Sequence, residues 1–200
     1  MAAMRRSITV GITGGSGAVY AVRLLPILAR HYARVDVVMS NAARQVLATE
    51  VETDAPREGR WTMAELDENA GEITVWNNQN YSAPFASGSN CAEQMLIIPC
   101  SMSTVASIAH GIDLNLLHHA AAVSIKEKRQ LIVLPRETPL SAIHLRNLLT
   151  LAELGVTVIP AMPGFYGGER TFDDLVDFVL QKVINHLGLD VRLRAKWGEA

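Results

Sequence analysis

The feature that most constrains the fold is an alternation of short β-branched runs with segments of helical periodicity. Strands that alternate with helices form parallel sheets, because each helix returns the chain to the edge where the next strand begins. The predicted fold is therefore α/β, a doubly wound, mainly parallel sheet with helices on both faces. The predicted strands are Ser7–Thr13, Arg34–Met39, Glu72–Val75, Met95–Pro99, Gln130–Pro135 and Val156–Pro160.

Apolar residues spaced three and four apart predict the helices between these strands. Thr171, followed by Asp173 and Asp174, is a good helix start, because oxygen caps and carboxylates suit the positive end of the helix dipole. A chain of 200 residues, 49% hydrophobic and without an internal repeat, suits a single domain over 1–200. Within it, 52–71 is predicted to be a surface insertion and 188–200 a C-terminal tail. The predicted helices are Ala18–His31, Asn41–Glu50, Thr104–His110, Asn115–Glu127, Ser141–Leu154 and Thr171–Leu187.

Composition argues against several classes of function. The net charge is -2 and no basic stripe is present, so no nucleic-acid partner is expected. No apolar run reaches the roughly 20 residues of a membrane helix, so we expect a cytoplasmic protein with no membrane partner. Cys91 and Cys100 have no paired spacing and are interpreted as reduced thiols, Cys100 in the core. His118 and His119 diverge by about 100° on a helix, so no metal site is predicted.

The turn "TGGSG" after the first strand is typical of a ligand-binding turn. Gly14, Gly15 and Gly17 would let the backbone approach a ligand, and the helix that follows points free N–H groups at an anion. NAD is disfavoured, because the second strand ends "VVMSN" without an acidic residue for the ribose hydroxyls. No Gly-Lys-Ser/Thr follows, which argues against Walker chemistry. A tight turn that holds no ligand stays open.

Two further loops are expected at the same edge of the sheet, since ligands bind beyond the carboxyl ends of parallel strands. In "PCSMST", Ser101, Ser103 and Thr104 could form a second anion cradle, or simply cap the helix. In "PRETP", Arg136 suits a phosphate and Glu137 could move a proton, although solvated loop residues are the common case.

Three other positions are ambiguous from the residues alone. In "MPGFYGG", Phe165 is predicted to be core, whereas Tyr166 could offer its hydroxyl to a ligand. Lys126 is either a surface lysine or a cation that faces the pocket. Glu50 is most simply a carboxylate at a helix end.

Several motifs in order resemble the UbiX-type flavin prenyltransferases over almost the whole chain. They are "VGITGGSGAVYAVRLL", "MSNAARQVLATE", "ASGSN", "IIPCSMST", "IKEKRQLIVLPRETPLSAIHLRNLLTLAELGVTVIPAMPGFY" and "DDLVDFVLQKVINHLGL". The resemblance implies Rossmann-like subunits in a homododecamer, with FMN bound where subunits meet. It implies a metal-independent prenyltransferase that joins a dimethylallyl group from dimethylallyl phosphate to N5 and C6 of reduced FMN. The prenylated FMN would then serve a partner UbiD-type decarboxylase.

The resemblance also implies roles for individual residues. Those implied to bind FMN are Gly14, Gly15, Ser16, Ser40, Ser101, Met102, Ser103, Thr104 and Arg136. Those implied to contact the donor phosphate are Lys126, Arg136, Tyr166 and Lys182. Those implied in catalysis are Ser16, Glu50, Lys126 and Glu137. The loop Ser87, Gly88 and Ser89 is implied to line the site from a neighbouring subunit.

The chain departs from the family pattern at three positions. His119 stands where the family carries an arginine, Ala122 where it carries an acid, and Lys182 where it carries a second arginine. Lysine keeps the charge but loses the fork geometry of a guanidinium. An FMN-binding homologue with another donor or without prenyl transfer, such as a flavin carrier, therefore stays open. So does a flavin-dependent cysteine decarboxylase, although the loop reads "FASGSN" where those proteins carry "PASANT".

Overall fold

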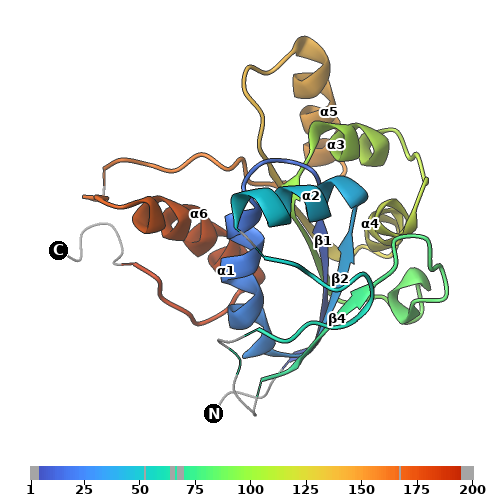
Figure 1. Ribbon diagram of the computed structural model, residues 1–200. Helices are drawn as coiled ribbons and strands as arrows, with labels where there is room; N and C mark the ends of the chain where they lie inside the picture. The colour runs from blue at the N-terminus through green and yellow to red at the C-terminus, as the bar shows by residue number, and fades with distance from the viewer. Residues whose placement is uncertain (1–4, 52, 64–65, 67–69, 167, 195–200) are drawn as a thin grey trace.

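The computed structural model describes residues 5–51, 53–63, 66, 70–166 and 168–194 (Figure 1). Its strands form one sheet in the order β3-β4-β2-β1-β5-β6-β7. All neighbouring strands pair in parallel except β3 and β4, so the predicted α/β sheet is confirmed. The strands are β1 (Arg5–Ile12), β2 (Tyr32–Met39), β3 (Gly59–Arg60), β4 (Glu72–Trp76), β5 (Gln94–Cys100), β6 (Gln130–Pro135) and β7 (Thr157–Val158).

The helices also follow the predicted order, with ends that differ by a few residues. Thr171 caps the last helix as predicted: its side chain accepts a hydrogen bond from the Asp174 N–H, and the Asp174 side chain accepts from the Thr171 N–H. The last strand is shorter than predicted, and β3 was not predicted because two residues carry no periodicity. The helices are α1 (Ala18–Ala29), α2 (Asn41–Glu50), α3 (Met102–Ala109), α4 (Leu116–Lys126), α5 (Ala142–Glu153) and α6 (Phe172–Leu187), with a 3₁₀ turn η1 (Pro84–Ala86).

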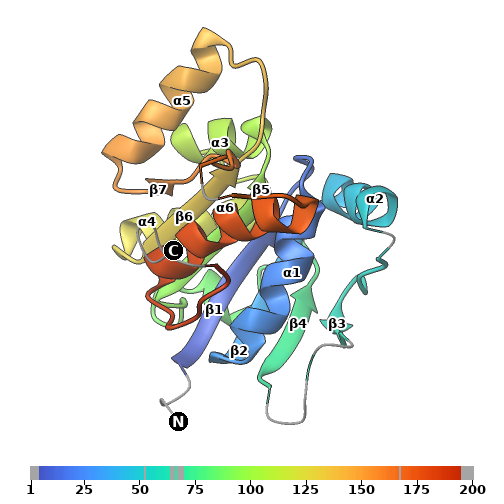
Figure 2. The ribbon, with the colours of Figure 1, turned by 90° about the vertical axis from the view of Figure 1, so that its left-hand side faces the viewer.

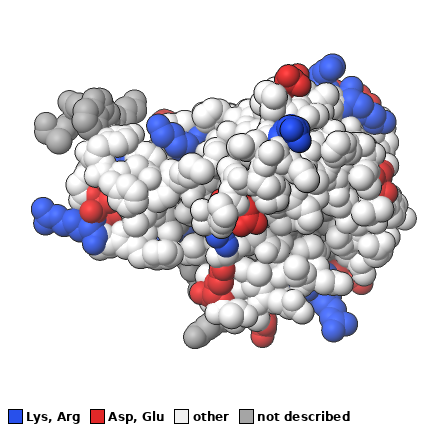
Figure 3. Space-filling model, turned by 90° about the horizontal axis from the view of Figure 1, so that it is seen from above, with Lys and Arg blue, Asp and Glu red and all other residues white. Residues whose placement is uncertain are grey.

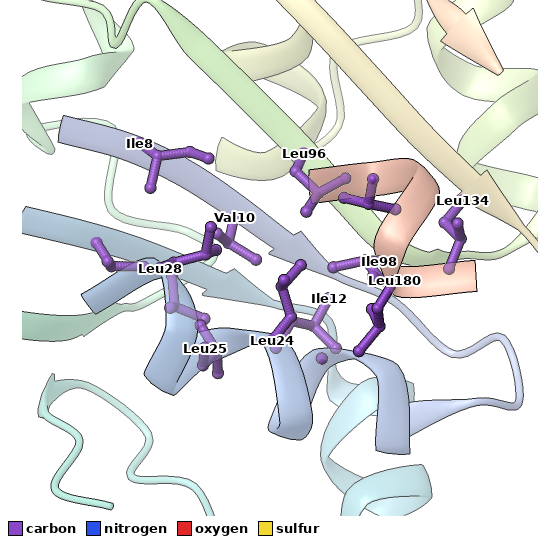
Figure 4. Packing of buried hydrophobic residues seen from close by; sticks show 14 of the residues in the cluster. Ile8, Val10, Ile12, Leu24, Leu25, Leu28, Leu96, Ile98, Leu134 and Leu180 are labelled. Atoms are coloured by element: carbon purple, nitrogen blue, oxygen red, sulfur yellow. The ribbon is translucent and has the colours of Figure 1, made fainter. Parts of the chain in front are cut away.

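The sheet is buried on both faces. Helices α1, α2 and α6 cover one face, which Figure 2 views from the side of α1 and α6. Helices α3 and α4 cover the other face. Because side chains alternate along a strand, Leu96 and Ile98 of β5 pack against the first layer, whereas Met95 and Ile97 pack against the second. Figure 4 shows part of the first layer, including Leu24 and Leu28 of α1.

Much of the predicted insertion 52–71 is packed against the edge of the sheet. β3 pairs with β4, and Trp61 and Met63 are buried. The Arg44 guanidinium of α2 donates to the carbonyls of three residues in this segment, 55, 56 and 57. Residues 52, 64–65 and 67–69 of the insertion and 195–200 of the tail lie outside the described residues, so both boundaries stay predictions.

The strand order reverses between β1 and β5, and Thr13 joins the two strands there. From β1 the chain runs to β2 and β4 on one side, and from β5 to β6 and β7 on the other. The Thr13 hydroxyl donates to the Pro99 carbonyl at 2.9 Å and accepts from the Ser101 N–H at 2.7 Å. Its own N–H donates to the same carbonyl at 3.1 Å. This 2% exposed side chain therefore holds the two loops at the crevice together.

Thr13→Val should destabilise the fold, because valine keeps the shape of threonine but neither donates nor accepts. Leaving the Ser101 N–H and the Pro99 carbonyl without this partner should cost about 1–3 kcal/mol of unfolding free energy. Urea unfolding at one fixed protein concentration measures the loss. Thr150→Val is the control, because the Thr150 hydroxyl donates to the Arg146 carbonyl within its own helix, a bond that ties no second element. Equal stability of the two variants would contradict this role for Thr13.

Candidate functional site

The turn between β1 and α1 receives its anion from within the chain. Gly17, at φ 110°, is the N-cap of α1 and has no side chain to accept the first N–H groups of the helix. The Glu50 carboxylate at the end of α2 accepts from the N–H of Gly17 at 2.8 Å and of Ala18 at 2.9 Å. The free N–H groups expected to face a ligand anion are thus bonded to Glu50. A carboxylate is well placed there, beside the positive end of a helix dipole.

Ser16 and Arg136 complete a cluster around this carboxylate. Arg136 directly follows β6, and its Nε donates to the Ser16 carbonyl at 3.4 Å. Burial opposes ionisation of Glu50, but the Ser16 side chain, the N–H groups of Gly17 and Ala18 and the positive charge of Arg136 outweigh it. Together they hold the pKa of the Glu50 carboxyl below its ordinary value. The structure therefore brings together three residues that the sequence placed on three separate motifs.

Tyr20, which the sequence analysis did not single out, lies close enough to Arg136 for the charge of the arginine to act on its phenol. Burial raises the pKa of its phenol, and the charge of Arg136 partly offsets that shift. Tyr20 is on the first turn of α1, where a helical apolar pattern gave no reason to single it out.

A group of hydroxyls lies across the crevice at the start of α3. Ser101 caps this helix by accepting from the Thr104 N–H, and its Oγ lies 3.0 Å from Ser103 Oγ and 3.1 Å from Thr104 Oγ1. Ser40 caps α2 in the same way by accepting from the Ala43 N–H at 3.1 Å. Met102 is buried. Helix capping therefore accounts for Ser40 and Ser101, and the same hydroxyls at helix N-termini are also suited to hold an anion.

Lys126 lies far from Arg136 within one chain. Lys126 ends α4 just before β6 begins, whereas Arg136 follows the last residue of β6. A strand of 6 residues spans about 20 Å, so the two cations are at opposite edges of the sheet. The side chain of Lys126 is 63% exposed, with its Nζ 3.8 Å from Glu127 Oε1.

The loop Ser87–Ser89 lies beside Lys126. The Ser87 and Ser89 hydroxyls are 3.0 Å apart. A Cβ on Gly88 would come within 2.3 Å of Glu127 Oε1, so glycine is needed for the loop to pass this close to the end of α4. The structure thus groups two of the implied elements, the loop and Lys126, away from the Glu50 cluster.

A third group forms around Phe178 of α6. The Tyr166 ring meets the Phe178 ring edge to face, with centroids 5.6 Å apart. Lys182 Nζ and Arg194 Cζ lie 5.7 Å and 4.5 Å from the centroid of the same ring. Arg194 also pairs with Glu169. Tyr166 and Lys182 are therefore brought together, on a ring that no sequence motif had singled out.

Two residues of the neighbouring loops are more exposed than their predicted roles suggest. Phe165 is 77% exposed, so its predicted place in the core is wrong. A residue flanked by a glycine and a tyrosine in a loop has no strand or helix to turn it inward. Glu137 is exposed, and its Oε1 accepts from the adjacent Thr138 N–H at 2.9 Å. Cys100 is buried as predicted, and burial raises the pKa of its thiol well above the ordinary value.

The surface around the crevice is open and carries few charges. A cavity of about 200 Å³ is lined by Gln45, Val46, Thr49 and Glu50 of α2. Pockets for drug-sized ligands usually enclose roughly 300–1,000 Å³, so this cavity of one chain does not enclose a ligand of that size. Figure 3, which looks down on this end of the molecule, shows a mostly uncharged face with isolated charged side chains.

Neither a metal cluster nor a membrane-spanning helix occurs among the described residues. In those ranges, no group of three or more His, Cys, Asp or Glu side chains could hold a metal ion. Nor does any helix of the described chain have the length and apolar character needed to cross a membrane.

Comparisons with known proteins agree over nearly the full length. The family model described as Flavoprotein matches residues 2–184. A flavin prenyltransferase UbiX of Alkalihalophilus pseudofirmus is 43% identical over 196 residues, covering 98% of this chain and 98% of that protein. A dodecameric FMN-dependent UbiX-like decarboxylase from Escherichia coli O157:H7 is 35% identical, with a TM-score of 0.82 over 96% of this chain and 98% of that one. A UbiX protein in complex with FMN and dimethylallyl pyrophosphate is 32% identical, with a TM-score of 0.82 over 96% and 99%.

Glu50→Gln should lower stability at neutral pH and leave it nearly unchanged in acid. Because the pKa of Glu50 is lowered by folding, its ionised form stabilises the fold above the unfolded value, about 4.3, and this contribution is lost as pH falls through the folded value. For a solvent-screened carboxylate at a helix start we expect about 0.5 kcal/mol at pH 7.

Unfolding free energies of wild type and variant, measured from about pH 7 to pH 3, show whether the stability difference shrinks as the pH falls. Glu153→Gln is the matched control, since Glu153 is the last residue of α5, where a carboxylate opposes the helix dipole. A stability gap for Glu50→Gln that stays constant over this pH range would contradict the assignment.

Proposed function

This chain belongs to the flavoprotein family, and from that premise we propose that it is a metal-independent flavin prenyltransferase. It joins a dimethylallyl group from dimethylallyl phosphate to N5 and C6 of reduced FMN. The observation that carries the proposal is the cluster of Ser16, Glu50 and Arg136 at the crevice between β1 and β5. A cation and a pair of proton-exchanging groups are what a reaction needs that expels a phosphate and moves protons.

The crevice is suited to FMN on both of its sides. The hydroxyls of Ser101, Ser103 and Thr104 at the start of α3 fit a phosphate, because the Ser101 hydroxyl lies within 3.1 Å of the other two at a helix N-terminus, where an anion is favoured. On the other side, a Cβ on Gly15 would meet its nearest protein atoms only at ordinary distances of 3.5–3.6 Å. The packing of the chain therefore does not require glycine at 15, which is consistent with a ligand that approaches the backbone. Bound there, reduced FMN supplies the nucleophilic ring atoms.

The donor phosphate requires cations, because the electron pair of the breaking C–O bond leaves with it. Arg136 would stabilise this departing charge, helped by Lys126, Lys182 and the Tyr166 hydroxyl. Glu137, next to Arg136 in the chain, would carry a proton to or from the phosphate. Ser16 and Glu50 would assist the loss of the ring protons, because Glu50 is ionised at neutral pH and its carboxylate, bonded to the Ser16 side chain, can accept a proton.

Self-association would complete this site, because its implied parts form separate groups in one chain. Lys126 with the loop Ser87–Ser89, and Tyr166 with Lys182, would reach Arg136 from neighbouring copies. Ile143, Leu145 and Leu149 leave an exposed apolar face on α5, which projects from the molecule (Figure 1). Faces of this kind mark protein interfaces, and identical copies provide a partner. A homododecamer like that of the Escherichia coli relative fits the proposal.

The product of the proposed reaction would serve a second protein, as the family resemblance implies. We assign prenylated FMN to a partner UbiD-type decarboxylase. The rival that stays open is an FMN-binding homologue with another donor or without transfer. Lys182 is the reason to test this rival, because a lysine presents a point charge to the donor phosphate where the family presents a guanidinium.

Purified protein incubated anaerobically with reduced FMN and dimethylallyl phosphate should yield a flavin heavier by one dimethylallyl group. Arg136→Met should lower the rate about 100-fold or more, the usual cost of removing one group that stabilises developing charge. Arg60→Met, on the exposed edge strand β3, is the control and should leave the rate unchanged. Mass spectrometry of the extracted flavin measures both. FMN recovered without added mass would favour the rival.

A further inference from the structure

His119 of α4 joins two segments that precede it in the chain. Its Nδ1 lies 2.5 Å from Asp113 Oδ2, in the connection before α4. Its Nε2 lies 3.1 Å from the carbonyl oxygen of Ala86, the last residue of η1. The loop Ser87–Ser89 begins at the next residue. The ring therefore bridges a carboxylate and the start of the loop proposed to line the flavin site.

The partners of His119 determine the protonation state of its ring. A carbonyl oxygen accepts hydrogen bonds and cannot donate, and the same holds for an ionised carboxylate. Both ring nitrogens must then carry a hydrogen for both bonds to form. The bridge is complete only while His119 is an imidazolium ion.

The remaining contacts of the loop show why the bond to Ala86 matters. The segment between β4 and β5 is held at its beginning by Asn78, whose carbonyl and side-chain oxygens accept from the N–H groups of Leu116 at 2.8 Å and Leu117 at 3.0 Å. Farther along, the loop has bonds of its own: the Asn90 N–H donates to the Ser87 carbonyl at 3.0 Å, and the Cys91 thiol donates to the Gly88 carbonyl at 3.3 Å. Gly88 also passes close to the Glu127 side chain at the end of α4. The His119 bond lies between these points and fixes the residue from which the loop departs.

On the described elements that contact the His119 ring, two titratable side chains face it, Asp113 and Tyr81. Asp113 is the charged group that faces its ring, from the connection before α4. Tyr81, from the segment after β4, packs edge to face with ring centroids 5.4 Å apart and carries no charge at neutral pH. On α4 itself, burial lowers the pKa of the neighbouring His118, and Asp113 partly offsets that shift.

We propose that His119, as an imidazolium ion, is a positioning residue for the loop Ser87–Ser89, and that raising the pH releases the loop. A neutral ring keeps a single N–H. The charge-assisted bond to Asp113 is the stronger of the two, so the neutral ring keeps its hydrogen on Nδ1 and loses the bond to Ala86. The consequence for catalysis rests on the proposed function, in which this loop lines the flavin site.

Hydrogen exchange of the full-length protein with FMN bound, followed by mass spectrometry of peptides covering 84–91, tests this directly. After correction for intrinsic exchange, wild-type protection should fall about tenfold between about pH 6 and pH 9, as expected for the loss of one hydrogen bond to a charged donor. His119→Ala should show low protection throughout. His31→Ala is the matched control, since the His31 ring bonds the carbonyl of Ile27 in α1, away from this loop, and this variant should behave as wild type.

Asp113→Asn is the decisive variant. The introduced amide can donate to Nδ1, so a neutral ring would carry its hydrogen on Nε2 and keep the bond to Ala86. Protection of the loop should then stay high at both pH values. Wild-type protection that does not change with pH, or low protection in Asp113→Asn matching His119→Ala, would overturn the proposal.

The dimethylallyl-transfer assay on the same samples separates this proposal from the proposed function. Transfer by wild type together with pH-independent protection would refute the role of His119 alone. The expected exchange pattern without transfer at any pH would support the role of His119 and refute the proposed function. The expected result is both the exchange pattern and a transfer rate that falls with loop protection in wild type but not in Asp113→Asn.

Discussion

The hydroxyl of Thr13 is the interaction on which the site depends. Where the strand order reverses, the chain leaves β1 and β5 toward opposite sides of the sheet, and there the loops after the two strands could separate. Thr13 bonds the end of β5 and the start of the next loop at once, so the Ser16 turn and the Ser101 hydroxyls keep a constant spacing. Glu50 fixes a third element in the same way, because its carboxylate accepts from N–H groups at the start of α1 and so holds the end of α2 there.

Much of the fold could be predicted, because it depends on patterns that lie within single segments. Strand runs, helical periodicity and the cap at Thr171 are local, and the structure confirms them. Phe165 was misplaced because an aromatic side chain in a loop lacks a periodic pattern that would indicate its environment. Short β3 was missed because edge pairing over two residues depends on β4 rather than on its own sequence.

The site was predicted in its parts more than in its arrangement. Ser16, Glu50 and Arg136 were identified by resemblance, and the structure shows them in one cluster. Their mutual contacts, and the contribution of Tyr20, could not be inferred because they join residues far apart in the chain. The bond between His119 and Asp113 joins positions only six apart, yet neither residue type nor spacing indicates that Ala86 would accept from the other nitrogen.

The length of β6 has a consequence for genetics. Because Arg136 and Lys126 lie at opposite ends of that strand, a shared pocket would draw them from different polypeptides. Two kinds of subunit, one substituted at Arg136 and the other at Lys126, would then form some intact active sites when they assemble together. Such a site takes its arginine from one kind of subunit and its lysine from the other. Complementation between such alleles follows from a distance inside a single chain.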